Sequence, residues 1–316
     1  MPSREHHLRP VPPIRPLRIE DTDGIVALYD RAMAAEPAIG PMSRSQWEAF
    51  VGHPQNRNGE DFRVALSGAQ LIGHAASYVR DHGRERARFC DLVVAPAFRR
   101  QGVGSALMSS LLKIDQQDDN VSFQAVAAQD WAAGIAFLTT LGFSYVDSDL
   151  DMRCVKLVPP SETLSHPISL ERVAEPASVA ADVARIHNAA YCSDGGSRVL
   201  TPDEMAANIS GVWVARESGR VLAFCRISLG PSLAWIESLA VHPGHHGRGI
   251  GKALTYHALQ SLEVGKDRSA GLIVSSTNAS ARAVYARLGF VALREQRRFS
   301  TPRKDLLAAM ERRHSS

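Results

Sequence analysis

The sequence predicts a mixed α/β fold made of two tandem domains, each a central mixed, mostly antiparallel sheet flanked by helices. Three observations lead to this prediction. The 316 residues are enough for about two domains of roughly 150 residues each. One pattern of residues occurs twice along the chain. Strand and helix patterns also follow one another in the same order around both copies.

The repeat consists of matching residues that lie 147 positions apart. The pairs are Pro96 and Pro243, Gly102 and Gly249, Gly104 and Gly251, Leu107 and Leu254, and Gly142 and Gly289. The period is far longer than the roughly 20 to 50 residues of solenoid repeats. We therefore expect one duplicated domain rather than an array.

Each copy predicts the same elements from hydrophobic periodicity and turn residues. In the first copy they are a helix at 21–35, a hairpin at 62–66 and 71–79, a strand ending at Val94, an amphipathic helix at 103–114, a strand at 121–127 and a helix capped by Gly142. In the second copy they are a helix at 180–191, a hairpin at 212–216 and 221–229, a strand ending at Val241, a helix after the glycines, a strand at 270–275 and a helix capped by Gly289.

Composition excludes several classes of protein. With 45% hydrophobic and 22% charged residues, the chain is neither collagen-like nor wholly disordered. No apolar run reaches the roughly 20 residues that cross a bilayer, and no apolar signal core opens the sequence, so we expect a cytoplasmic protein without membrane contact. The net charge of +3 gives no basis for nucleic-acid binding. Four widely separated cysteines predict neither disulfides nor a zinc site.

A glycine loop between a strand and a helix stands in both copies. The N-terminus of a helix presents unpaired N–H groups, which makes it a site for phosphate oxygens. A P-loop is excluded because Ala253 follows Lys252 where Ser or Thr is required, and a Rossmann fingerprint is excluded by the spacing of Gly247, Gly249 and Gly251. The nearby His242, His245 and His246 lack a matched carboxylate, so no metal site is expected.

The loops resemble motif A of the Gcn5-related N-acetyltransferase (GNAT) superfamily, whose pattern is Arg/Gln-x-x-Gly-x-Gly/Ala. The stretch Arg99-Arg100-Gln101-Gly102-Val103-Gly104 matches it throughout, whereas His246-Gly247-Arg248-Gly249-Ile250-Gly251 has His in the first place. Residues 278–290 are similar to the family's Asn-x-x-Ala-x-x-x-Tyr-x-x-Leu-Gly-Phe. Among tandem members, the length and layout most resemble the mycothiol synthase type.

This resemblance implies that each loop binds the pyrophosphate of acetyl-CoA, largely through main-chain N–H groups. Arg248 or His245 is expected to supply positive charge where His246 replaces Arg. The implied cofactor-binding residues are Leu239, Val241, His246, Gly247, Arg248, Gly249, Gly251, Lys252 and Asn278 in the second copy, and Val94, Arg99, Arg100, Gly102 and Gly104 in the first.

The resemblance also implies the groups that carry the chemistry. The main-chain N–H near Leu239, beside a strand bulge, would bind the thioester carbonyl. Glu237 would be the general base and Tyr285 the acid that protonates the leaving thiolate. The 147-residue offset places Cys90, Trp131 and Leu138 where the second copy has Glu237, Asn278 and Tyr285.

The first copy is therefore expected to bind the cofactor without the proton-transfer groups. Asp91 lies one residue from Cys90, and a shift of one residue on a strand turns the side chain to the other face. For this reason, Asp91 is expected to be a poor substitute for Glu237.

We expect an arm at 1–16, an N-terminal domain at 17–158, a linker at 159–167, a catalytic C-terminal domain at 168–304 and a tail at 305–316. The expected partners are acetyl-CoA and a small-molecule amine, with no nucleic acid or membrane, and the chain is a monomer or homodimer. The amine is expected between 191 and 208 and the last hairpin, 290–299. Two alternatives stay open: a non-catalytic acyl-CoA-binding or sensing protein, and an aminoacyl-tRNA-dependent ligase of the tandem GNAT type.

Overall fold

The chain forms two compact units, which we describe from a computed structural model. The structure describes residues 12–53, 56–57, 59–82, 85–113, 121–161, 164, 167–192, 199–209, 211–266 and 268–314. Within these residues, no helix combines the length and the apolar character that crossing a membrane requires.

The first unit comprises Met1–Arg80, Arg86–Val146 and Arg297–Ser316. Its strands follow the order β1 (Ile14–Pro16), β2 (Phe62–Ser67), β3 (Gln70–His82), β4 (Glu85–Val94), β5 (Ser122–Ala128) and β12 (Val291–Pro302). Strands β1 to β3 pair antiparallel, whereas β4 and β5 pair parallel.

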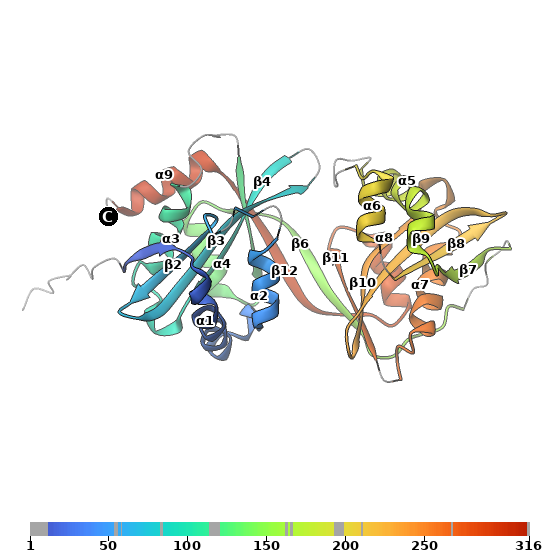
Figure 1. Ribbon diagram of the computed structural model, residues 1–316, viewed down its shortest axis with the longest axis horizontal. Coiled ribbons are helices and arrows are strands. Elements are labelled where there is room, and N and C mark those ends of the chain that lie inside the picture. The colour runs from blue at the N-terminus through green and yellow to red at the C-terminus, as the bar shows by residue number, and fades with distance from the viewer. Residues whose placement is uncertain are drawn as a thin grey trace, which may run out of the picture. The chain divides into compact units, whose positions relative to one another are not determined.

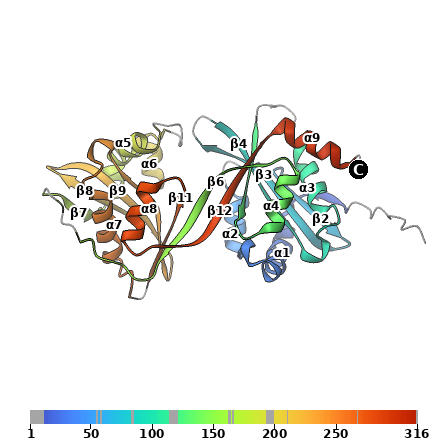
Figure 2. The ribbon, with the colours of Figure 1, turned by 180° about the vertical axis from the view of Figure 1, so that it is seen from behind.

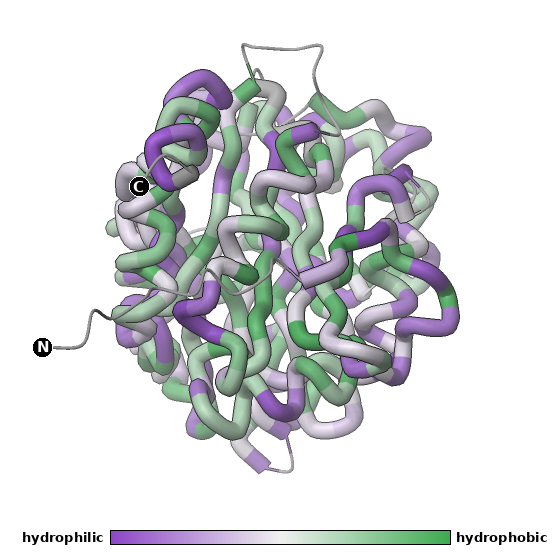
Figure 3. Tube along the Cα trace, turned by 90° about the vertical axis from the view of Figure 1, so that its left-hand side faces the viewer, coloured by the Kyte–Doolittle hydropathy of each residue, from purple (hydrophilic) through white to green (hydrophobic). Residues whose placement is uncertain are grey.

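Two pairs of helices cover the two faces of this sheet. One face carries α1 (Thr22–Ala35) and α2 (Arg44–Val51), which stand in front of the strands in Figure 1. The other face carries α3 (Val103–Leu112) and α4 (Ala132–Thr140), which are labelled in the reverse view of Figure 2. Hydrophobic residues follow the central strands, and hydrophilic residues gather in turns and on outer helices (Figure 3).

The second unit comprises Asp81–Glu85 and Asp147–Gln296. Its strands follow the order β7 (Ser169–Arg172), β8 (Val212–Glu217), β9 (Arg220–Leu229), β10 (Leu233–Val241), β11 (Ser269–Ser275) and β6 (Ser144–Cys154). The helices α5 (Ala180–Tyr191) and α6 (Pro202–Asn208) cover one face, and α7 (Ile250–Ser261) and α8 (Ala279–Arg287) cover the other. Short 3₁₀ turns in the two units lie at Ile19–Asp21, Pro37–Ile39, Pro96–Phe98, Pro176–Val179 and Pro243–His245.

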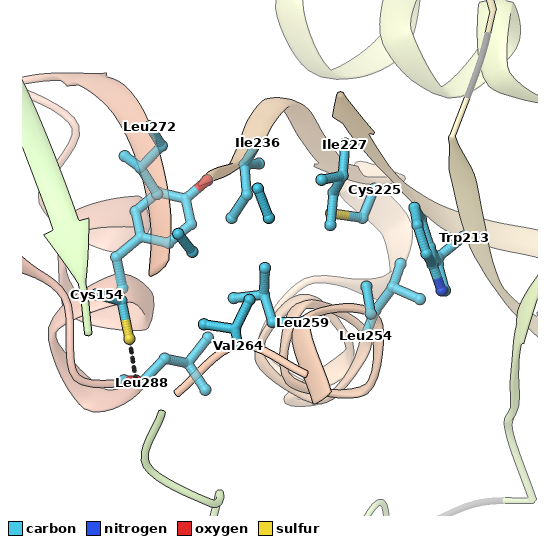
Figure 4. Close-up of a cluster of buried hydrophobic side chains, with 14 of the residues drawn as sticks. Cys154, Trp213, Cys225, Ile227, Ile236, Leu254, Leu259, Val264, Leu272 and Leu288 are labelled. Atoms are coloured by element: carbon cyan, nitrogen blue, oxygen red, sulfur yellow. Dashed lines mark hydrogen bonds between the residues drawn. The ribbon is translucent and has the colours of Figure 1, made fainter. Parts of the chain in front are cut away.

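The last strand of each sequence repeat belongs at least partly to the other unit. Strand β6 follows α4 along the chain, yet it pairs antiparallel with β11, from Cys154 opposite Ala270 to Asp149 opposite Ser275. Figure 4 shows Cys154 within the core of the second unit, where its thiol donates a hydrogen bond to the Leu288 carbonyl at 3.6 Å. The end of β12 and helix α9 (Arg303–His314) belong to the first unit.

The mixed α/β architecture confirms the predicted fold class, and both hairpins form at the predicted turns. Four segments differ from the sequence analysis. Residues 14–16 of the expected arm form the edge strand β1, and most of the expected tail is α9, whose Leu306 and Met310 are buried. The short helices α2 and α6 were not expected, although each begins with a capping box, at Ser43 and at Thr201.

Because α9 completes the first unit, a substitution near the C-terminus should destabilise the N-terminal unit. Leu306 is fully buried beside Phe299 and Leu107 in one cluster. Leu306→Ala should lower the free energy of unfolding by about 2 to 5 kcal/mol, as is typical of buried Leu→Ala changes. Urea unfolding followed by tryptophan fluorescence would measure the loss. The control Lys304→Ala, at an exposed position of the same helix, should change stability by less than about 0.5 kcal/mol. Equal effects of the two variants would contradict this packing.

Candidate active site

Both glycine loops open a helix with backbone geometry that favours glycine. Gly102 has φ of +81° at the start of α3, and Gly249 has φ of +75° at the start of α7. A Cβ at Gly102 would meet nothing within 4 Å, so the loop surface there is open. Because the first turn of each helix has unpaired N–H groups, both loops can accept an anion.

The residue in the first motif position anchors the loop to the end of the preceding strand. The Arg99 Nε donates a hydrogen bond to the Val94 carbonyl at 3.1 Å. In the second unit, the His246 Nε2 lies 2.9 Å from the Val241 carbonyl oxygen, so His makes the contact that Arg makes in the first unit. The departure of His246 from the family pattern therefore preserves this anchor.

The basic residues expected to add charge are already engaged. Arg248 pairs with Glu217 at 2.6 Å and contacts His245 Nδ1 at 3.0 Å, so neither residue is an unpaired charge for the loop. Lys252 is only 7% exposed on α7. Asn278 accepts a hydrogen bond from the Ala281 N–H at 3.0 Å, which makes it the N-cap of α8. Gly247, like Gly249, has a positive φ, and Arg100 in the first unit has φ of +59° and is exposed.

Strand β10 contains a bulge at Glu237. Its pairing with β9 shifts by one residue between Ile236 and Ser238, so Glu237 is the extra residue. The parallel pairs between β10 and β11 run from Leu233 opposite Ser269 to Trp235 opposite Gly271, and end two residues before Glu237. The bulge therefore lies where β10 leaves its parallel neighbour, as the family resemblance implies.

The alternation of hydrogen bonds along β10 shows which of its main-chain groups point away from β9 and toward β11. The His242 N–H donates to the Leu222 carbonyl at 2.9 Å, so this pair is of the hydrogen-bonded type. In an antiparallel ladder the types alternate, so Val241 and Leu239 direct their main-chain groups away from β9. The Tyr191 hydroxyl donates to the Leu239 carbonyl at 2.6 Å, which agrees with this direction. The N–H groups of Leu239 and Val241 thus line the side of β10 that faces β11.

Glu237 lies on the sheet face covered by α5 and α6. The Ser228 hydroxyl donates a hydrogen bond to the Glu237 carboxylate at 2.6 Å. Ser228 is opposite Trp235 on the face away from the α7 and α8 core, because the neighbouring Ile227 and Ile236 enter that core. Glu237 is exposed, so a substrate can reach its carboxylate.

A platform of side chains spans three strands beside Glu237. The Arg153 guanidinium on β6 lies 4.9 Å from the centre of the Trp235 ring on β10, and it also forms an ion pair with Asp151. Gly271 lies between them on β11, where an added Cβ would come within 2.8 Å of both Arg153 and Trp235. This platform was not expected from the sequence, because β6 belongs to the other repeat.

Tyr285 is buried in the core of the second unit. Burial raises the pKa of its hydroxyl, and the nearby Cys225 and Tyr191 raise it further. Burial also raises the pKa of Tyr191 to about 12. Both hydroxyls therefore stay protonated at neutral pH. Tyr191 was expected only as part of the acceptor pocket between 191 and 208, a segment whose residues 193–198 lie outside the described part of the chain.

The counterparts in the first unit offer other chemistry. Burial raises the pKa of the Cys90 thiol to about 12, and Leu138 is part of the core. Trp131 packs against the same core, so it supplies no cap like that of Asn278.

Comparisons with known proteins show the family to which this chain belongs. Residues 25–143 and 182–290 each match the model of the acetyltransferase (GNAT) family. A mycothiol acetyltransferase from Streptomyces coelicolor is 27% identical over 294 residues, covering 90% of this chain and 92% of that protein. One from Mycolicibacterium vanbaalenii is 30% identical over 242 residues, covering 72% and 78%.

Solved structures show the same fold. A GCN5-related N-acetyltransferase from Sphaerobacter thermophilus has a TM-score of 0.77 at 16% identity, covering 93% of this chain and 97% of its own. A tandem GNAT protein from the clavulanic acid biosynthesis pathway has a TM-score of 0.68 at 17% identity, covering 92% and 98%. These similarities confirm the predicted family resemblance and the duplicated fold.

The raised pKa of Tyr285 predicts the pH dependence of an activity that uses its proton. A tyrosine ordinarily loses its proton near pH 10, and burial moves this loss to higher pH. Thioester cleavage should therefore show no decline between about pH 7 and pH 10 that belongs to Tyr285. Tyr285→Phe should lower turnover by a similar factor throughout that range, measured as thiol release. An alkaline decline below pH 10 that disappears in Tyr285→Phe would contradict the protonated state assigned to this hydroxyl.

Proposed function

Because this chain belongs to the GNAT acetyltransferase family, we propose that its C-terminal unit moves an acetyl group from acetyl-CoA to the amine of a small molecule. The observation that carries the proposal is the bulge at Glu237, where β10 and β11 separate. The carboxylate of Glu237 and the outward-facing N–H groups of Leu239 and Val241 thereby lie on one strand, and the glycine loop follows directly after that strand. Bound acetyl-CoA supplies the activated acyl group.

The residues of the second unit fit the cofactor in order along β10. The N–H groups of Leu239 and Val241 point toward β11 beyond the last β10–β11 pair, where they can bind the thioester carbonyl and the amide-rich arm of the cofactor. Beyond them, the loop from His246 to Gly251 offers the N-terminus of α7 to the pyrophosphate. Main-chain groups carry this binding, since Arg248 is paired with Glu217.

Glu237 and Tyr285 divide the proton transfers. An amine must lose a proton as it attacks the thioester, and the exposed carboxylate of Glu237 accepts that proton directly or through water. The hydrogen bond from Ser228 fixes the orientation of this carboxylate. The Tyr285 hydroxyl, which burial keeps protonated, gives its proton to the leaving thiolate.

The platform of Trp235, Arg153 and Asp151 supports a polar acceptor. It lies on the same sheet face as Glu237 and presents an ion pair beside an aromatic ring. A polar or cationic amine finds a carboxylate there, whereas a purely apolar amine finds little to bury. Mycothiol-related amines belong in the acceptor panel because the curated relatives carry mycothiol in their name.

The first unit also keeps a complete cofactor loop. Gly102 has the same left-handed geometry as Gly249, and Arg99 makes the same anchor as His246. We propose that both units bind coenzyme A. Thioester consumption with amines would separate this function from a non-catalytic acyl-CoA sensor, and a requirement for aminoacyl-tRNA would favour the ligase alternative.

Removal of the general base should slow turnover more than it weakens cofactor binding. Glu237→Gln keeps the shape of the side chain but cannot accept a proton, so turnover should fall by about 10² to 10⁴ at neutral pH. The loss should shrink as pH rises, because the amine then deprotonates unaided. Steady-state rates with acetyl-CoA and a polyamine such as putrescine would measure this. The control Glu175→Gln, at an exposed position before α5, should behave as wild type. Unchanged turnover in Glu237→Gln would leave Glu237 only a structural role.

Two cofactor sites predict two calorimetric events that can be removed separately. Gly102→Glu and Gly249→Glu each place a negative side chain at a left-handed position in a phosphate loop, so each should abolish one coenzyme A site. Gly40→Glu is the matched control, because Gly40 has φ of +76° and open space around it but lies outside both loops. It should keep both sites. Loss of all binding in Gly249→Glu alone would show that the first unit binds no cofactor.

A further inference from the structure

Strand β4 of the first unit alternates without interruption along its last residues. Val93 and Ala95 enter the core under α1 and α2. The even-numbered residues of the same stretch, Cys90, Leu92 and Val94, pack against the core under α3 and α4. Asp91 therefore turns toward the α1 and α2 face. The corresponding face of the second unit is the one on which Glu237 lies.

This placement overturns the sequence-based reason for dismissing Asp91. The repeat aligns Glu237 with Cys90, and an offset of one residue should reverse the face. Strand β10, however, has an extra residue at Glu237, whereas the packing of β4 shows none between Cys90 and Ala95. The extra residue in β10 therefore compensates for the one-residue offset between Asp91 and Cys90. Asp91 and Glu237 thus point to equivalent faces.

Asp91 also stands where β4 leaves its parallel neighbour. The pairs between β4 and β5 run from Ala87 opposite Ser122 to Cys90 opposite Ala125, so Asp91 directly follows the last pair. The Ala95 N–H donates to the Ile72 carbonyl at 2.8 Å, so Val94 directs its own main-chain groups away from β3. The first unit therefore repeats the arrangement of the second: a carboxylate at the separation, outward-facing amides and a glycine loop.

The surroundings of Asp91 are those of a functional rather than a stabilising group. Its carboxyl has no hydrogen bond or ion pair to any described residue, and burial raises its pKa. Tyr29 on α1 lies close enough for the charge of Asp91 to raise the pKa of the Tyr29 hydroxyl, after the effect of burial. Asp91 is half-buried, and a partly desolvated carboxylate without a partner lowers stability, so its presence calls for another explanation.

We propose that Asp91 is the proton acceptor of a second acyl-transfer site, in the first unit, whose substrate is an amine carried on an aromatic or apolar group. This inference rests on the proposed binding of acetyl-CoA at the loop from Arg99 to Gly104. The acceptor class follows from aromatic rings on the same face: Tyr78 on β3 stacks on Phe89, two residues before Asp91, at 6.0 Å. Phe50 on α2 contacts the same Tyr78 ring at 5.1 Å.

The step balances without any other reagent. The amine nitrogen attacks the thioester carbon, the N–C bond forms and the C–S bond breaks. The proton lost by the amine passes to the Asp91 carboxylate. The thiolate of coenzyme A takes a proton from water, because Leu138 stands where the second unit has Tyr285.

The test uses the full chain with the proposed C-terminal site disabled by Glu237→Gln and Tyr285→Phe. With acetyl-CoA and phenethylamine, this double variant should keep turnover, whereas putrescine turnover should be lost. Adding Asp91→Asn should then reduce phenethylamine turnover by about 10² to 10⁴. Adding Asp30→Asn instead, an exposed carboxylate on α1, should leave it unchanged. Asp91→Asn should melt at the same or a higher temperature, since it removes a half-buried carboxyl without a partner, and a structural role would predict a lower one.

The two proposals fail in different ways. If wild type acetylates phenethylamine but the double variant does not, the second site does not exist and the C-terminal proposal stands. Full turnover in the triple variant with Asp91→Asn would also overturn the role of Asp91. If phenethylamine turnover needs Asp91 and not Glu237, the second site is supported even where putrescine is not a substrate of the first.

Discussion

The proposed site of the second unit depends on the direction in which each main-chain N–H and C=O group of β10 points. A strand can present its amides to only one neighbour at each residue, and the bond from His242 to Leu222 fixes which residues face β9. Leu239 and Val241 are left facing β11, yet the parallel pairs have already ended at Trp235. Their N–H groups are therefore available to a ligand beside Glu237. One inserted residue gives a strand that pairs with β11 at its start and leaves its main-chain groups open at its end, where we propose that the cofactor binds.

Because the end strands are exchanged, each unit contains residues from both sequence repeats. Strand β6 comes from the first repeat but supplies Arg153 and Asp151 to the platform beside Glu237, where Gly271 leaves room for the contact with Trp235. In return, the end of β12 and α9 bury Phe299, Leu306 and Met310 in the first unit. Neither repeat, cut at its sequence boundary, would contain all the residues of its own unit.

Short-range signals predict most of this fold. The hairpin turns, the amphipathic stripe from 103 to 114 and the capping glycines depend on neighbouring residues, and Gly142 and Gly289 do adopt positive φ. The glycine loops could also be found, because Gly102 and Gly249 need a left-handed backbone. The bulge at Glu237 has no short-range signal, since it arises from how two strands pair, and only the family resemblance implied it. The strand exchange and the face of Asp91 could not be predicted for the same reason.

The two carboxylates have come to differ in environment while keeping their place in the fold. Glu237 is exposed and hydrogen-bonded by Ser228, which suits a solvated acceptor. Asp91 lies among aromatic side chains, as does His74, a fully buried imidazole with neither ring nitrogen bonded to any described residue. Two unpaired polar groups on one face of a core are destabilising. Such groups are retained where they serve a function, which agrees with the role that we propose for Asp91, whereas α9 adds Leu306 and Met310 to the apolar core on the opposite face.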